Sequence, residues 1–83
     1  MQVNSTPVLV INSGSSSIKF SLYDMQHERL QLSGILECIG EVDGNSVYRD
    51  HTATGNVDES TESAPIADHA TGLQQIFSFL QSN

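Results

Sequence analysis

The sequence is poor in the residues that several protein classes require. Its 83 residues contain one cysteine, no tryptophan and only three lysines and arginines against ten acidic residues. One cysteine excludes an internal disulfide and a zinc site built from several cysteines, and it is typical of a reducing compartment. So few basic residues cannot cover a nucleic acid, and no apolar run approaches the roughly 20 residues that span a bilayer. We therefore expect a cytoplasmic protein with no nucleic-acid and no membrane partner.

The chain is short and acidic. Its length is that of one small domain or of a piece of a larger one, and a core of this size is marginal without a partner. The net charge is −7, and seven of the ten acidic residues lie from Glu41 onward. We interpret this acidic half as a solvated surface, and we expect Cys38 to be a small apolar residue that is buried or half-buried.

Three antiparallel β-strands joined by short connections are predicted within residues 8–39, after a polar leader at residues 1–7. The uninterrupted run from Val8 to Ile11 favours a central strand covered on both faces. A second strand alternates, and its apolar face consists of Ile18, Phe20 and Leu22. The third runs from Leu30 to Ile39 and carries Gly34 at a bulge or a point of close approach. Its apolar face consists of Leu30, Leu32 and Leu36.

Residues 40–67 are predicted to hold a small hairpin and an acidic loop. Asp43-Gly44 is a tight-turn signal between two short strands, and the polar segment from Thr52 to Pro65 forms a loop or, at most, weak edge strands. Residues 68–82 show helical spacing, with Asp68 as the N-cap. The apolar stripe of this helix consists of Ala70, Leu73, Ile76, Phe77 and Leu80. A helix after consecutive strands is typical of a crossover to a parallel strand, so we expect an N-terminal fragment of an α/β domain.

The stretch NSGSSSIKF, which begins at Asn12, is the candidate site. It lacks the spacing of a Walker loop and of the dinucleotide-binding fingerprint. Gly14 lets the backbone approach an anion closely, and Lys19 carries a positive charge for phosphate oxygens. Three hydroxyl donors lie between them, namely Ser15, Ser16 and Ser17. The amide oxygen of Asn12 suits Mg²⁺. The alternative is an ordinary hairpin turn that binds no ligand.

The segment VLVINSGSSSIKFSLYD closely resembles the first phosphate loop of the acetate and propionate kinases. Their signature reads Val or Ile, Asn, any residue, Gly, three Ser, Leu or Ile, Lys, and Phe or Tyr. These enzymes belong to the actin-like ATPase superfamily, so the resemblance implies the start of an actin-like, ribonuclease H-like α/β domain. It also implies a homodimeric enzyme that uses ATP and Mg²⁺ to phosphorylate acetate reversibly to acetyl phosphate.

By the same resemblance, Asn12 corresponds to the magnesium-site asparagine and Lys19 to the ATP-site lysine of the family. Ser15 and Ser17 correspond to loop serines near the transferred phosphoryl group, and Gly14 and Ser16 complete the ATP-binding loop. The family's substrate arginine, its catalytic aspartate and histidine, and its adenosine-binding loops lie beyond this segment. We therefore assign no catalytic residue here, and we expect the chain alone to be inactive.

Two alternatives to acetate kinase activity stay open. The acceptor can be propionate or another short-chain acid, because the pocket that selects the acid is not in this segment. A different class of protein would be a truncated, non-catalytic module with the same fold. We expect surface roles for Arg29 and Arg49. The three histidines, His27, His51 and His69, share no spacing that would predict a metal site.

Overall fold

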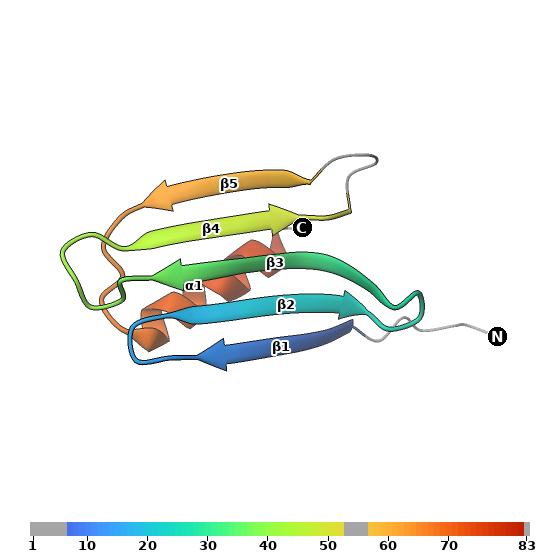
Figure 1. Ribbon diagram of the computed structural model, residues 1–83, viewed down its shortest axis with the longest axis horizontal. Coiled ribbons are helices and arrows are strands. Elements are labelled where there is room, and N and C mark those ends of the chain that lie inside the picture. Colours follow the sequence, from blue (N-terminus) through green and yellow to red (C-terminus); the bar gives the residue numbers. More distant parts are fainter. Residues whose placement is uncertain (1–6, 53–56, 83) are drawn as a thin grey trace.

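Five strands form one antiparallel sheet in the described part of the chain, and one helix packs against one face of it (Figure 1). The structure is a computed structural model that describes residues 7–52 and 57–82. The elements are β1 (Pro7–Ser13), β2 (Ile18–Asp24), β3 (Arg29–Glu37), β4 (Asn45–Asp50), β5 (Asp58–Ser63) and α1 (His69–Gln81). The strands follow one another across the sheet in sequence order. The predicted order of antiparallel strands followed by a helix is confirmed, while residues 1–6 of the predicted leader lie outside the described residues.

Strand β1 forms where the apolar run predicts it, but it lies at an edge of the sheet. It pairs with β2 alone among the described strands. Val8 and Val10 are 41% and 43% exposed. The prediction of a strand covered on both faces is therefore wrong for the part of the chain that the structure describes. An apolar run predicts that a strand forms. Whether other elements cover both faces of that strand depends on where the fold places it.

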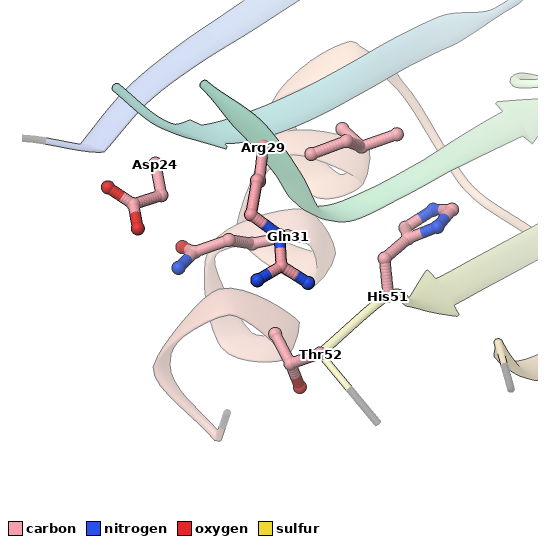
Figure 2. A pocket seen from close by; sticks show the side chains of 6 residues that line it. Asp24, Arg29, Gln31, His51 and Thr52 are labelled. Atoms are coloured by element: carbon pink, nitrogen blue, oxygen red, sulfur yellow. The ribbon is translucent and has the colours of Figure 1, made fainter. Parts of the chain in front are cut away.

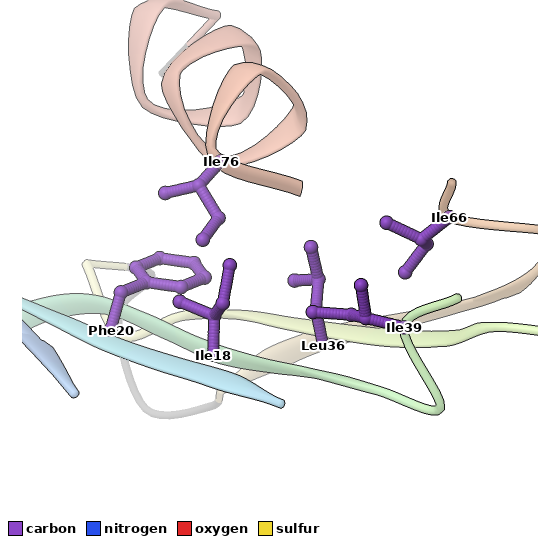
Figure 3. Close-up of a cluster of buried hydrophobic side chains, with 6 residues drawn as sticks. All are labelled: Ile18, Phe20, Leu36, Ile39, Ile66 and Ile76. Carbon is purple, nitrogen blue, oxygen red and sulfur yellow. The ribbon is translucent and has the colours of Figure 1, made fainter. Parts of the chain in front are cut away.

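The core lies between α1 and the face of the sheet that β2 and β3 turn toward the helix (Figure 3). Its buried side chains are Ile18, Phe20, Leu36, Ile39, Ile66 and Ile76. The predicted alternation of β2 is confirmed, since Ile18 and Phe20 are each 1% exposed. Lys19 consequently lies on the opposite face of the sheet. Burial of one such side chain contributes about 1.5–3 kcal/mol, so this layer holds β2 firmly in place.

Gly34, in the middle of β3, is a point of close approach, as predicted. A Cβ at this position would lie 2.4 Å from the carbonyl oxygen of Val47 and 2.6 Å from Cε1 of Phe20. A Cβ atom does not make non-bonded contacts this short. Neither the β4 backbone nor a buried ring can move aside at a small energetic cost. Only glycine fits here without displacing the strand or the ring.

The bulge in β3 is at Gln31 rather than at Gly34. The pairing with β2 shifts between Leu22 and Tyr23, so that Gln31 has no partner in β2. Leu30 therefore faces away from α1, whereas Leu32 stays buried on the helix side. The prediction that both leucines share one face is wrong, because one extra residue reverses the alternation of side chains beyond it.

Residues 38–44 connect β3 to β4 and contain no strand. The chain turns at Cys38 and Gly40, whose φ angles are 57° and 86°; Cys38 is half-buried, as predicted. Gly44 lies beside Ala64, and the two exchange backbone hydrogen bonds of 3.1 Å each. The predicted tight turn at Asp43-Gly44 is therefore wrong, because Gly44 extends the pairing of β4 with β5. Strand β5 is an edge strand whose residues are all exposed, which agrees with the prediction of at most weak edge strands.

Helix α1 begins at His69, and Asp68 caps it as predicted. An oxygen of the Asp68 carboxylate accepts the backbone N–H of Thr71 at 2.8 Å. This hydrogen bond holds the pKa of Asp68 below its usual range, because it favours the charged carboxylate. Within the described residues, no helix is long and apolar enough to cross a membrane.

The buried stripe of α1 differs from the predicted one at two positions. The members that pack on the core as predicted are Leu73, Ile76 and Leu80. Ala70 and Phe77 are exposed instead, Phe77 by 45%. Phe79 takes the place of Phe77, and its ring centroid lies 6.0 Å from that of Phe20. Helical spacing does not predict which residues at the edge of an apolar stripe are buried. Here Phe79 is half-buried because it packs against aromatic side chains of the sheet.

Candidate phosphate-binding site

The turn between β1 and β2, residues 14–17, lies beside the start of α1 at one end of the sheet (Figure 1). Three hydrogen bonds hold its carbonyl groups. The N–H of Gly14 donates to the Ser17 carbonyl at 2.8 Å, and the N–H of Ile39 donates to the Ser16 carbonyl at 3.0 Å. Nε2 of His69 lies 2.8 Å from the Gly14 carbonyl oxygen. The turn is thus tied to itself, to the connection after β3 and to the first residue of α1.

The donor groups of the same turn are free to meet a ligand. The backbone N–H groups of Ser15, Ser16 and Ser17 donate to no backbone carbonyl in residues 7–52 and 57–82. Ser15 and Ser16 are exposed, and Ser17 is half-buried. Backbone N–H groups are strong donors that need an acceptor, and several of them in one turn form a concavity suited to an anion. The arrangement therefore fits a phosphate group.

Gly14 makes room for this turn. A Cβ at Gly14 would lie 3.0 Å from Oγ of Ser17, which is tighter than an ordinary contact. The backbone of Gly14 has no positive φ, so the glycine provides space beside the Ser17 hydroxyl rather than a left-handed conformation. A larger residue would push the Ser17 hydroxyl away from its position over the turn.

Asn12 and Lys19 lie directly opposite one another in the β1–β2 ladder. Opposite residues of an antiparallel pair project from the same face, with Cβ atoms about 4.5–5.5 Å apart. That face is the one turned away from α1, and both residues are exposed. Lys19 has no ion-pair partner among the described residues. An amide oxygen and an ammonium group are therefore presented together, two residues before and two residues after the turn.

Lys19 also borders a shallow depression of about 410 Å³ on that face. Further along it lies Arg49, which donates to a carboxylate oxygen of Glu59 at 2.7 Å. Both side chains of this ion pair are largely exposed, in agreement with the surface role predicted for Arg49. Lys19 therefore differs from Arg49 on the same face, because the positive charge of Lys19 is not already paired with an acid in the described residues.

The residues present fit Mg²⁺ only in part. Asn12 offers one amide oxygen, and the described residues contain no group of three His, Cys, Asp or Glu side chains that could hold a metal ion. Mg²⁺ takes six oxygen ligands and keeps several waters, with phosphate oxygens often supplying others. Asn12 can therefore act as one ligand, directly or through a water, for an ion whose other ligands are waters and phosphate oxygens.

The three histidines lie at separate places. His27 contacts the Asp24 carboxylate at 2.7 Å, and Nε2 of His51 lies 2.9 Å from the Ser33 hydroxyl. His69 alone reaches the candidate site. The contact between His69 and Gly14 joins residues 55 positions apart, so the sequence carried no local signal for it beyond the predicted helix start.

A second hollow lies at the other end of β2 (Figure 2). It has a volume of about 150 Å³ and is lined by Asp24, Arg29, Leu30, Gln31, His51 and Thr52. Strand β2 runs from Ile18 to Asp24, so this hollow is about 20 Å from the turn at a rise of about 3.3 Å per residue. None of the predicted site residues lines it, and it is separate from the candidate site.

The chain is similar to known proteins over nearly its whole length. The sequence profile of the Acetokinase family matches residues 7–83. An acetate kinase of Campylobacter fetus subsp. fetus is 50% identical over 66 residues, which cover 80% of this chain and 16% of the relative. Acetate kinases of Lawsonia intracellularis and Helicobacter pylori are 41% and 45% identical, each over 69 residues that cover 83% of the chain and 17% of the relative. The chain thus spans about a sixth of the length of these curated relatives.

Proposed function

Because the chain belongs to the acetokinase family, we propose that the protein carrying it is an acetate kinase. In this reaction a carboxylate oxygen of acetate attacks the γ-phosphorus of ATP. The bond from that phosphorus to the oxygen bridging the β- and γ-phosphates breaks, and its electron pair leaves with ADP. The products are acetyl phosphate and ADP, and the reaction is reversible.

One observation carries the proposal. The carbonyl groups of Gly14 and Ser16 are bonded to other segments of the protein, while the N–H groups of the three turn serines donate to no backbone carbonyl in the described residues. Phosphoryl transfer passes through a loose transition state, so a protein accelerates it mainly by positioning the phosphate and by stabilising its charge. A turn held by hydrogen bonds to Ile39, in the connection after β3, and to α1 is suited to positioning. Exposed N–H and hydroxyl groups beside an unpaired lysine are suited to the charge.

The site residues take the following roles in this proposal. The ammonium of Lys19 contacts the nucleotide phosphates, and the donors of the turn bind phosphate oxygens, with Gly14 leaving the space for them. These donors come from Ser15, Ser16 and Ser17. Asn12 orients Mg²⁺ on its phosphate ligands. When bound, Mg²⁺ neutralises charge on the phosphate oxygens.

The remaining features of the proposal concern the protein as a whole. We place the sheet and helix in an actin-like, ribonuclease H-like domain. The consecutive antiparallel strands β1 to β3, and the helix α1 that comes after β5, support this placement. A homodimer in the cytoplasm is part of the same proposal. The 83 residues alone are expected to be inactive, because the residues that bind the acid and adenosine in this family lie beyond this segment.

The test is a kinase assay on the complete protein that carries this sequence. It is incubated with ATP, Mg²⁺ and either acetate or propionate; acyl phosphate is trapped with hydroxylamine, and ADP is measured in parallel. We expect acetyl phosphate and ADP in equal amounts, with a higher kcat/KM for acetate. A higher kcat/KM for propionate would favour the alternative acceptor. No acyl phosphate from either acid would contradict a kinase and favour a non-catalytic module.

A further inference from the structure

The hydrogen bond between His69 and Gly14 links the first residue of the helix to the first residue of the turn. Nε2 of His69 lies 2.8 Å from the Gly14 carbonyl oxygen, and the histidine is half-buried. A carbonyl oxygen can only accept, so Nε2 is the donor and carries the hydrogen. Building on the proposed function, we propose that His69 is a positioning residue that orients the turn for binding the transferred phosphate.

The geometry of the peptide bond explains how one carbonyl can matter. The Gly14 carbonyl and the Ser15 N–H belong to the same planar, trans peptide unit, so they point in opposite directions. When His69 holds the carbonyl on its own side, the Ser15 N–H must point away from His69. His69 thereby fixes the direction of the Ser15 N–H without contacting it.

A second peptide group of the turn is oriented in the same way. The N–H of Ile39 holds the Ser16 carbonyl at 3.0 Å, and this carbonyl shares its peptide unit with the N–H of Ser17. Two of the three free N–H groups are therefore aimed by bonds to neighbouring elements. The bond from Ile39 comes from the backbone and survives any substitution there except proline, whereas the bond from His69 depends on a side chain. Substitution of His69 thus tests this orientation selectively.

The helix itself does not need a histidine at this position. Asp68 already caps the N-terminus by accepting the Thr71 N–H, and Ile76 anchors the helix in the core. A histidine in the first turn is not favoured by the helix dipole, since its positive end lies there. The contribution of His69 is therefore directed at the turn, and the stability of α1 rests on other residues.

The experiment compares His69→Ala and His69→Gln in the complete protein that carries this sequence. The Gln side-chain amide can place an N–H donor near the position of Nε2, whereas Ala removes the donor. We expect His69→Ala to lower kcat about tenfold, the effect of losing one well-placed donor, with the KM for acetate and the melting temperature little changed. His69→Gln should recover most of kcat. His51→Ala removes another half-buried histidine that bonds to Ser33, and it should leave kcat unchanged.

The outcomes separate the inference from the function on which it rests. An active wild-type protein whose kcat survives His69→Ala would overturn the inference alone. Equal losses in the Ala and Gln variants, accompanied by a lower melting temperature, would also overturn it and indicate a purely structural contact. A wild-type protein that forms no acyl phosphate would remove the proposed function, and the inference would fall with it.

Discussion

Two hairpins of the same sheet differ in how firmly their residues are held. In β1–β2, the turn is bonded to Ile39, two residues after the end of β3, and to His69 at the start of α1. In β4–β5, every residue of β5 is exposed, and Arg49–Glu59 is an ion pair between exposed side chains. Both hairpins contain several serines, so serine content alone does not distinguish them.

The difference shows what turns a polar hairpin into a candidate site. Strand β2 places Ile18 and Phe20 in the core on one face while Lys19 stays exposed on the other. The protein groups that bind a reacting phosphate must themselves be held in place to within a fraction of an ångström. Strand β5 has no buried side chain, so nothing fixes its polar groups in this way.

The largest contrast between the hairpins is expected in stability. Ile18→Ala removes a side chain that is 1% exposed, and it should lower the free energy of unfolding by about 2–5 kcal/mol. Thr61→Ala in β5 changes an exposed residue, and its effect should stay within about 0.5 kcal/mol. Urea denaturation of the complete protein with each substitution measures both values. Similar losses for the two variants would contradict the idea that β2 is anchored in the core and β5 is not.

The next contrast concerns activity, and it compares the two cations on the face turned away from α1. Lys19→Ala should lower kcat about ten- to a hundredfold, because a charge-assisted contact is worth about 1.5–3 kcal/mol. Arg49→Ala removes a charge that Glu59 already pairs, so kcat should not change. Steady-state kinetics at saturating ATP and acetate, with melting temperatures as a check on folding, give both values. Near wild-type turnover of Lys19→Ala would show that the turn is an ordinary hairpin.

A smaller effect is expected inside the turn. Ser15→Ala and Ser17→Ala should each lower kcat by about two- to tenfold, since a neutral hydrogen bond contributes about 0.5–1.5 kcal/mol. Ser16→Ala should matter less, because the middle hydroxyl is not among those expected to face the transferred phosphoryl group. Kinetics on the three variants rank them directly. If Ser16→Ala lowered kcat more than the other two substitutions, the proposed orientation of the turn would be wrong.

The smallest effect is a dependence on pH at the start of α1. The pKa of Asp68 is lowered in the folded protein by the hydrogen bond from Thr71, so the charged carboxylate stabilises the fold above its unfolded pKa of about 3.9. This contribution is lost as the pH falls through the lower, folded value. Melting temperatures between pH 6 and pH 3 should therefore decline more steeply for the wild type than for Asp68→Asn, in which the cap cannot titrate. Parallel curves would show that the ionisation of Asp68 does not contribute to the pH dependence of stability.

Local patterns were reliable where neighbouring residues decide the structure. The alternation of β2, the cap at Asp68 and the close approach at Gly34 were all predicted and are all present. Predictions failed where a distant element decides. The cover of β1 depends on its place at the sheet edge, and the choice of Phe79 over Phe77 depends on which rings the sheet presents.

The sequence by itself determined the chemistry of the candidate site, since Asn12, Gly14, the three serines and Lys19 are contiguous or nearly so. It also determined that Asn12 and Lys19 share a face, because a short turn fixes which residues of two antiparallel strands meet. Only the tertiary structure decided which way the turn's peptide groups point. That direction depends on Ile39 and His69, which lie 23 and 55 positions away from the turn residues that they bond. Such long-range contacts form only when α1 packs on the sheet, and no local propensity encodes them.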